Sequence, residues 1–254
     1  MQFVRVLVAY LKLGWVGVYT CLYLARLFLL RPFLSAERYQ RLGHLTIYQW
    51  ARTTMFVIGA RIRVHGQLPT HGTLLVANHI TYVDPPLLLS LTPCTMLAKA
   101  EVAKYPVIGP GAQAVGILFV KREAEGSRTA AQKAIADGLQ AGRVVGIFPE
   151  GTTSPDGVVQ AFRPGSFKAA VSVGAPVVPV AITYTTPNLA WIGAESLAPH
   201  FIRCHSTHKV TVDVWVGPTL VSDDPEYLRE QAETWIRSQV EAHSVTPARP
   251  LAQG

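Results

Sequence analysis

The residues best suited to chemistry in this chain are a histidine and an aspartate, His79 and Asp84, in the segment NHITYVD. Histidine can take a proton from a hydroxyl group near neutral pH, and a carboxylate bonded to its other ring nitrogen fixes the tautomer. Because this spacing does not place both residues on one helix face, we expect a turn to join them, favoured by Pro85 and Pro86. The spacing alone is common, so a loop histidine beside a capping aspartate is the alternative.

Three further segments lie in or next to apolar runs, and two of them place polar side chains at the end of the run. FPEGTTS (148–154) follows the candidate strand Val144–Phe148, and ligand contacts gather at the carboxyl ends of such strands. GILFVKR (116–122) places two cations, Lys121 and Arg122, at the end of a candidate strand. The planar guanidinium of arginine can bind an anionic headgroup with two parallel hydrogen bonds. VVPVAI (177–182) by itself indicates only a buried strand with a proline. Taken singly, each segment also fits an ordinary turn or strand end.

In this order and spacing, the four segments resemble the glycerolipid acyltransferase family, typified by lysophosphatidic acid acyltransferases. That family is marked by N-H-x4-D, G-x-x-F-[IV]-x-R, F-P-E-G-[TS] and V-P-[VI]-x boxes, and the resemblance covers residues 60–220. It implies that His79 and Asp84 form the catalytic dyad and that Arg122 meets the phosphate of the acceptor. The other substrate-binding residues that we expect are Asn78, Lys99, Glu150, Gly151 and Thr152.

The resemblance also implies a reaction. A fatty acyl chain would pass from a thioester, acyl-coenzyme A or acyl carrier protein, to the free hydroxyl of a lyso-glycerolipid, most directly 1-acylglycerol-3-phosphate. Neither a cofactor nor a metal is implied. With His79 as the base and no covalent nucleophile, we expect both substrates to be bound together. Thr153 stands where members of the family commonly have arginine, which leaves another acceptor such as lyso-ornithine lipid open; Arg163 lies nearby and could supply a replacement charge.

The body of the chain predicts an α/β fold, with a central mixed, mostly parallel sheet flanked by helices, because short β-branched runs alternate with helical stretches. The candidate strands are Ile62–Val64, Leu74–Ala77, Thr95–Ala98, Ile117–Val120, Val144–Phe148, Val177–Thr183 and Val210–Val216. The candidate helices are Pro85–Ser90, Ala100–Lys104, Arg128–Ala141, Phe167–Val173 and Pro225–Glu241.

Composition and charge point to a membrane surface. Charged residues make up 15% of the chain, below the usual quarter, and hydrophobic residues 49%. Residues 1–64 carry nine basic side chains and one acid, whereas the remaining 190 residues carry 14 basic and 15 acidic groups. A basic, apolar N-terminus suits anionic membrane lipids better than nucleic acid, because its cations lie among long apolar runs. We therefore expect membrane association, on the cytoplasmic face of the inner membrane.

The N-terminal segment predicts two membrane-associated helices. The longest charge-free run, Leu13–Ala25, has 13 residues where a bilayer crossing needs about 20, which favours a helix lying in the interface. A polar seam spaced by seven residues would let its cations reach the headgroups; it consists of Arg5, Lys12, Tyr19 and Arg26. Arg31 and Pro32 separate this helix from a second one, Glu37–Ile58, which could equally pack on the domain.

These patterns divide the chain into a membrane-associated segment at 1–58, an acyltransferase domain at 59–244 and a loose tail at 245–254.

The glycines of GPGAQA (109–114) resemble a dinucleotide-binding fingerprint, but no clear strand precedes them. Four possible metal ligands lie close together in the sequence: His200, Cys204, His205 and His208. Because zinc sites usually draw ligands from more than one segment and no second cluster accompanies these, we expect them in a loop rather than a zinc site. The three scattered cysteines indicate a reducing compartment. A non-enzymatic lipid-binding protein is the competing hypothesis.

Overall fold

The computed structural model describes residues 2–99, 104, 109, 111–112, 115, 117–120, 127–154, 157–186, 189–190, 196–207 and 209–244. Across these residues a seven-stranded sheet has the order β1-β7-β6-β2-β5-β3-β4. Its strands are β1 (Arg61–His65), β2 (Leu74–Ala77), β3 (Cys94–Lys99), β4 (Leu118–Val120), β5 (Val144–Ile147), β6 (Val177–Tyr184) and β7 (Thr211–Val216). The predicted mixed, mostly parallel sheet is confirmed, because only the β6–β7 pair is antiparallel among these strands.

Strand direction decides which residues meet at one edge. β2, β3, β4, β5 and β6 run the same way, so their carboxyl ends lie together. β7 pairs antiparallel with β6, with Val212 opposite Tyr184, and β1 runs parallel to β7. The amino ends of β1 and β7 therefore share the edge at which the other five strands finish.

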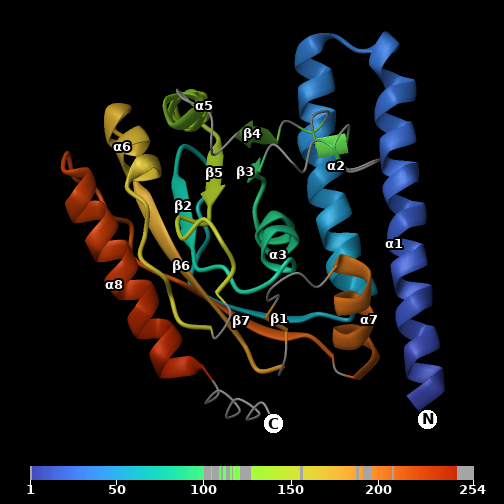
Figure 1. Cartoon of the computed structure of the whole chain (residues 1–254). Helices are drawn as coiled ribbons and strands as arrows, with labels where there is room; N and C mark the ends of the chain where they lie inside the picture. Colours follow the sequence, from blue (N-terminus) through green and yellow to red (C-terminus); the bar gives the residue numbers. More distant parts are fainter. Residues whose placement is uncertain are drawn as a thin grey trace.

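Helices cover both faces of the sheet. The helices are α1 (Gln2–Leu30), η1 (Arg31–Phe33), α2 (Ala36–Val57), α3 (Asp84–Leu91), α5 (Ser127–Gln140), α6 (Gly165–Ser172), α7 (Leu197–Thr207) and α8 (Pro225–His243). One core cluster joins the sheet to α1, α2, α3 and α7, and a second joins its other face to α5, α6 and α8. In Figure 1 the long helices α1 and α2 lie side by side on one side of the sheet, and α8 crosses the other.

Three of the four residues in the polar seam of α1 contact the protein, namely Lys12, Tyr19 and Arg26, whereas Arg5 is exposed. Tyr19 is buried and its hydroxyl lies 2.6 Å from Thr54 Oγ1 on α2. Arg26 donates to Gln49 Oε1 at 3.0 Å, also on α2. The seven-residue spacing correctly placed these residues on one face of a helix, but that face holds α1 against α2.

An apolar, exposed face of α1 lies next to this seam. Phe3, Trp15 and Leu22 expose 79%, 55% and 62% of their surfaces. The helical stretch Phe3–Phe33 is long and apolar enough to cross a membrane by length and composition, and only 11% of its most apolar window is buried. Length therefore does not exclude crossing, contrary to the expectation from the short charge-free run. An exposed apolar surface of this kind indicates membrane association.

The predicted helices are confirmed except in two places. Residues 200–207 belong to α7, so the expected loop ahead of β7 is wrong. The buried faces of Phe201 and Cys204 explain the helix, because both pack into the core shared with α1 and α3. The expected helix Ala100–Lys104 lies outside the described residues, apart from Lys104, and so does the tail at 245–254.

Candidate active site

The imidazole of His79 and the carboxylate of Asp84 form a hydrogen-bonded pair at the carboxyl end of β2. His79 Nδ1 lies 2.8 Å from Asp84 Oδ2. Because an ionised carboxylate only accepts hydrogen bonds, Nδ1 carries the proton and Nε2 has the free lone pair. The side chain of His79 is 18% exposed, whereas that of Asp84 is fully buried. A base with its lone pair directed away from a buried carboxylate is suited to taking a proton from a bound hydroxyl.

The loop between the two residues wraps around the carboxylate. The backbone N–H groups of Ile80 and Thr81 donate to Asp84 Oδ2 at 2.6 and 2.8 Å. Asp84 N donates to the Thr81 carbonyl at 3.1 Å, which closes the expected turn. Asp84 is also the first residue of α3, where an acidic group is favoured by the helix dipole.

Tyr184, the last residue of β6, supplies a further donor to the same carboxylate. Its hydroxyl donates to Asp84 Oδ1 at 2.6 Å. Burial, followed by the negative charge of Asp84, raises the pKa of Tyr184 well above its usual value of 10.0, so the hydroxyl keeps its proton. Both oxygens of Asp84 are therefore fixed, and the imidazole of His79 is held in one orientation. The sequence held no signal for this contact, since the two residues are 100 positions apart.

Phe148 and Glu150 bring the turn after β5 against His79. The rings of Phe148 and His79 stack with centroids 4.2 Å apart and planes 18° apart. Glu150 Oε1 accepts the backbone N–H of His79 at 2.7 Å, and Oε2 accepts the N–H of Gln160 at 2.8 Å. Ser154 N donates to the His79 carbonyl at 2.7 Å. The segment FPEGTTS (148–154) thus bonds to both the backbone N–H and the backbone carbonyl of His79.

Burial changes the titration of Glu150, which is only 4% exposed. Burial raises the pKa of its carboxyl from 4.5 to about 7, although the N–H groups of Gln160 and His79 oppose the change. Both carboxylate oxygens are occupied by backbone donors. This geometry favours a positioning role for Glu150 over the acceptor contact implied by the family resemblance.

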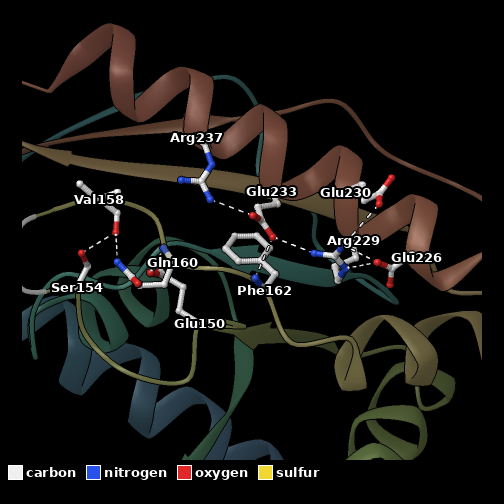
Figure 2. A network of polar contacts seen from close by, with 10 residues as sticks. All are labelled: Glu150, Ser154, Val158, Gln160, Phe162, Glu226, Arg229, Glu230, Glu233 and Arg237. Carbon is white, nitrogen blue, oxygen red and sulfur yellow. Dashed lines mark hydrogen bonds and ion pairs between the residues drawn. The ribbon is translucent and has the colours of Figure 1, made fainter.

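A second carboxylate anchors the segment that follows. Glu233 of α8 accepts the N–H of Phe162 through Oε2 at 2.9 Å, and Arg229 and Arg237 flank it at 3.1 and 2.9 Å. Figure 2 shows this chain of contacts running from the arginines of α8 toward Gln160 and Glu150. Helix α8 therefore supports the turn that supports His79.

Asn78 joins β2 to β6. Its amide donates from Nδ2 to the Ile182 carbonyl at 2.9 Å, and Oδ1 accepts the Ile182 N–H at 2.7 Å. The residue is 1% exposed. These contacts fix Asn78 at the base of the His79 loop, and its expected contact with the substrate stays a prediction.

The remaining predicted residues lie at the same edge or outside the described chain. Gly151 is buried in the turn with a φ of +76°, a conformation that favours glycine, and Thr152 beside it is exposed. Lys99 is the last residue of β3, so its main chain lies at the carboxyl edge. Arg122 lies outside the described residues. Among the described residues no group of three or more His, Cys, Asp or Glu side chains is placed to hold a metal ion.

Comparisons with known proteins identify the family of this chain. A family model described as Acyltransferase matches residues 61–183. A lyso-ornithine lipid O-acyltransferase from Pseudomonas aeruginosa is 33% identical over 195 residues, which cover 74% of this chain and 75% of that protein. The chain belongs to the acyltransferase family. A 1-acyl-sn-glycerol-3-phosphate acyltransferase from Neisseria meningitidis serogroup B is 28% identical to this acyltransferase, covering 76% of this chain and 80% of that one.

The fold of the acyltransferase also matches a solved structure. The crystal structure of the 1-acyl-sn-glycerophosphate acyltransferase PlsC from Thermotoga maritima superposes with a TM-score of 0.71. The match covers 95% of this chain and 97% of that chain at 23% sequence identity. The likeness therefore extends to the N-terminal helices as well as the sheet.

Proposed function

We propose that this acyltransferase moves a fatty acyl chain from an acyl thioester to the free hydroxyl of a lyso-lipid, without a cofactor. The pair formed by His79 Nδ1 and Asp84 Oδ2 carries the proposal, because it leaves Nε2 as a base at a partly exposed edge of the sheet. The matched family supplies the class of reaction. The same geometry argues against a purely lipid-binding protein, which has no need of a buried carboxylate that fixes an imidazole tautomer.

In the proposed reaction His79 Nε2 takes the acceptor's hydroxyl proton as the oxygen attacks the thioester carbonyl carbon. The tetrahedral intermediate then collapses, the carbon–sulfur bond breaks, and the protonated Nε2 returns its proton to the leaving thiolate. Asp84 stays ionised and stabilises the imidazolium between the two steps. The products are a diacylated lipid and a free thiol, coenzyme A or acyl carrier protein.

Two acceptors have support. 1-Acylglycerol-3-phosphate is named for the relative from Neisseria meningitidis, and a lyso-ornithine lipid for the relative from Pseudomonas aeruginosa. Thr153, in place of the arginine common in lysophosphatidic acid acyltransferases, favours the second acceptor. For a phosphate-bearing acceptor, Arg122 and Lys99 would supply the cations that the family resemblance implies.

The N-terminal segment, residues 1–58, would hold the site at the membrane, and residues 59–244 would carry the chemistry. The exposed apolar face of α1 would enter the acyl region of the bilayer, on the cytoplasmic face of the inner membrane. Anionic lipids would attract the basic residues of this segment that remain exposed, such as Arg5 and Arg41. No disulfide joins Cys21, Cys94 and Cys204 to one another, which suits a reducing compartment.

The test is an assay of the purified full chain with labelled acyl-coenzyme A or acyl carrier protein and a panel of lyso-lipids. His79→Ala should lower transfer about 10²- to 10⁴-fold. A matched control exists, because His65 Nε2 and Asp213 Oδ1 form a second histidine–aspartate pair, 2.8 Å apart, on β1 and β7. His65 ends β1 and so lies at the opposite edge of the sheet, and His65→Ala should keep transfer intact. Full transfer by His79→Ala, or no transfer to any lyso-lipid by the wild type, would refute the proposal.

A further inference from the structure

The guanidinium of Arg163 lies across the turn that follows Glu150. A Cβ atom placed on Gly151 would come within 2.9 Å of Arg163 Cζ and 3.0 Å of its Nε. The planar group thus covers the α-carbon of Gly151, and any larger residue at position 151 would displace it. Because Glu150 bonds to the main chain of His79, this cation contacts the turn that also holds the base of the candidate catalytic dyad.

Backbone contacts hold the segment that carries Arg163 in this position. Its N–H donates to the Pro149 carbonyl at 3.1 Å. On the preceding residues, Phe162 N is bonded to Glu233 and Gln160 N to Glu150. Figure 2 shows how Glu233 of α8 reaches the main chain of Phe162. The segment that carries Arg163 is therefore fixed at three points, from α8 and from the FPEG turn itself.

The charge of Arg163 has no compensating carboxylate in the described part of the chain. The residue is exposed, and no described acidic side chain forms an ion pair with it. The neighbouring carboxylate of Glu150 directs both oxygens to backbone N–H groups. A planar guanidinium on the turn that holds the main chain of His79 is suited to a ligand with paired anionic oxygens.

We propose that Arg163 binds the anionic group of the acceptor headgroup and so sets which lyso-lipids His79 acylates. This inference rests on the proposed lyso-lipid acyltransferase function. The shared chemistry is a pair of anionic oxygens, supplied either by the phosphate of 1-acylglycerol-3-phosphate or by the carboxylate of a lyso-ornithine lipid. The planar fork of arginine can meet either group with two parallel hydrogen bonds.

The experiment compares Arg163→Gln and Arg163→Lys with the wild type on 1-acylglycerol-3-phosphate, a lyso-ornithine lipid and uncharged 1-monoacylglycerol. Arg163→Gln should raise the KM for the preferred anionic acceptor about 10- to 100-fold, as expected for one lost hydrogen bond to a charged group. The KM for monoacylglycerol should stay within about two-fold of the wild-type value. The kcat with monoacylglycerol and with the preferred anionic acceptor should do the same. Arg163→Lys should restore part of the affinity, and the anionic acceptor with the larger change in KM identifies the source of the anion.

Lys168→Gln is the matched control, because it removes an exposed cation from the nearby helix α6 and should change no KM. Equal losses on charged and uncharged acceptors, or an unchanged KM for both anionic lyso-lipids, would overturn the role of Arg163. Equilibrium binding of the same lyso-lipids without a donor gives an independent readout, in which Arg163→Gln should weaken binding of the anionic lipids alone. If the wild type transfers no acyl chain, the proposed function fails, while the binding comparison still decides the role of Arg163.

Discussion

Glu150 Oε1 accepts the backbone N–H of His79 at 2.7 Å, so a carboxylate that lies 71 positions away in the chain fixes the main chain of the base. Its other oxygen accepts the N–H of Gln160, which belongs to the segment anchored on α8. The carboxylate therefore joins the β2 loop to the β5 loop. A glutamate in this position is needed for its two acceptor oxygens, and only secondarily for its charge.

Replacing Glu150 tests this positioning role. Glu150→Gln keeps one acceptor but turns an NH₂ group toward a backbone N–H donor, and we expect kcat to fall about 10- to 100-fold. The KM for the acceptor should change little, because the side chain does not face it. Steady-state kinetics with each substrate varied in turn measure both constants. The exposed Glu37→Gln on α2 is the control, and a rise in KM at unchanged kcat would instead favour direct contact with the acceptor.

The raised pKa of Glu150 predicts how stability depends on pH. Between 4.5 and about 7 the folded protein keeps a proton that the unfolded chain has released. Raising the pH through this window therefore lowers the free energy of unfolding, by on the order of 3 kcal/mol. Thermal unfolding from pH 4.5 to pH 7.5 should show Tm falling more steeply for the wild type than for Glu150→Gln. Parallel curves for the two proteins would contradict the raised pKa.

Tyr184→Phe removes one donor from Asp84 and keeps the ring. Asp84 Oδ1 would then be buried without that partner, which costs about 1 to 3 kcal/mol and loosens the imidazole of His79. We expect kcat to fall about ten-fold and Tm to fall by several degrees. Tyr227→Phe, at an exposed position on α8, should change neither quantity. Wild-type activity in Tyr184→Phe would show that Asp84 orients His79 without this hydroxyl.

The exposed face of α1 predicts membrane binding that is separable from folding. The triple variant Phe3→Gln, Trp15→Gln and Leu22→Gln alters only exposed side chains, so its Tm should stay near that of the wild type. Each side chain contributes roughly 1.5 to 3 kcal/mol when it is fully buried in an apolar phase. Sedimentation with vesicles that contain anionic phospholipid should therefore show a large loss of bound protein. Val221→Gln, on an exposed loop, is the control, and undiminished binding of the triple variant would place the anchor elsewhere.

Local sequence patterns predicted the strands and the pairing of His79 with Asp84. They could not predict contacts between residues on different strands of the sheet. His79 and Asp84 are joined by a short turn, so their spacing carried the necessary information. Tyr184 reaches Asp84 only because β6 lies beside β2, and no local signal states which strands are neighbours. Periodicity likewise placed Tyr19 on the polar seam of α1 but could not state what that seam faces.

The missed helix α7 has a related cause. Its histidines and Cys204 suggested ligands or a loop, since the segment lacks a long apolar period. In the structure His200 is fully buried and its Nε2 lies 3.0 Å from the Ala190 carbonyl, while His205 Nε2 lies 3.0 Å from the hydroxyl of Tyr82. Burial lowers the pKa of His205 from 6.5 to about 4, so it packs as a neutral residue. Buried, hydrogen-bonded histidines therefore occupy a helix face that the sequence showed as polar.

The pairing of β1 with β7 sets an order of events during synthesis. Arg63 and Asp213 of these strands are 150 positions apart, so α1, α2 and β1 leave the ribosome long before β7 exists. The apolar helix α1 could reach a bilayer during that interval, whereas the distant strand pairing forms late because it must close a long loop. Under the membrane role that we propose for α1, a newly made chain would be anchored before its sheet is complete, and it would meet its lipid substrates as an immature enzyme that cannot yet consume them.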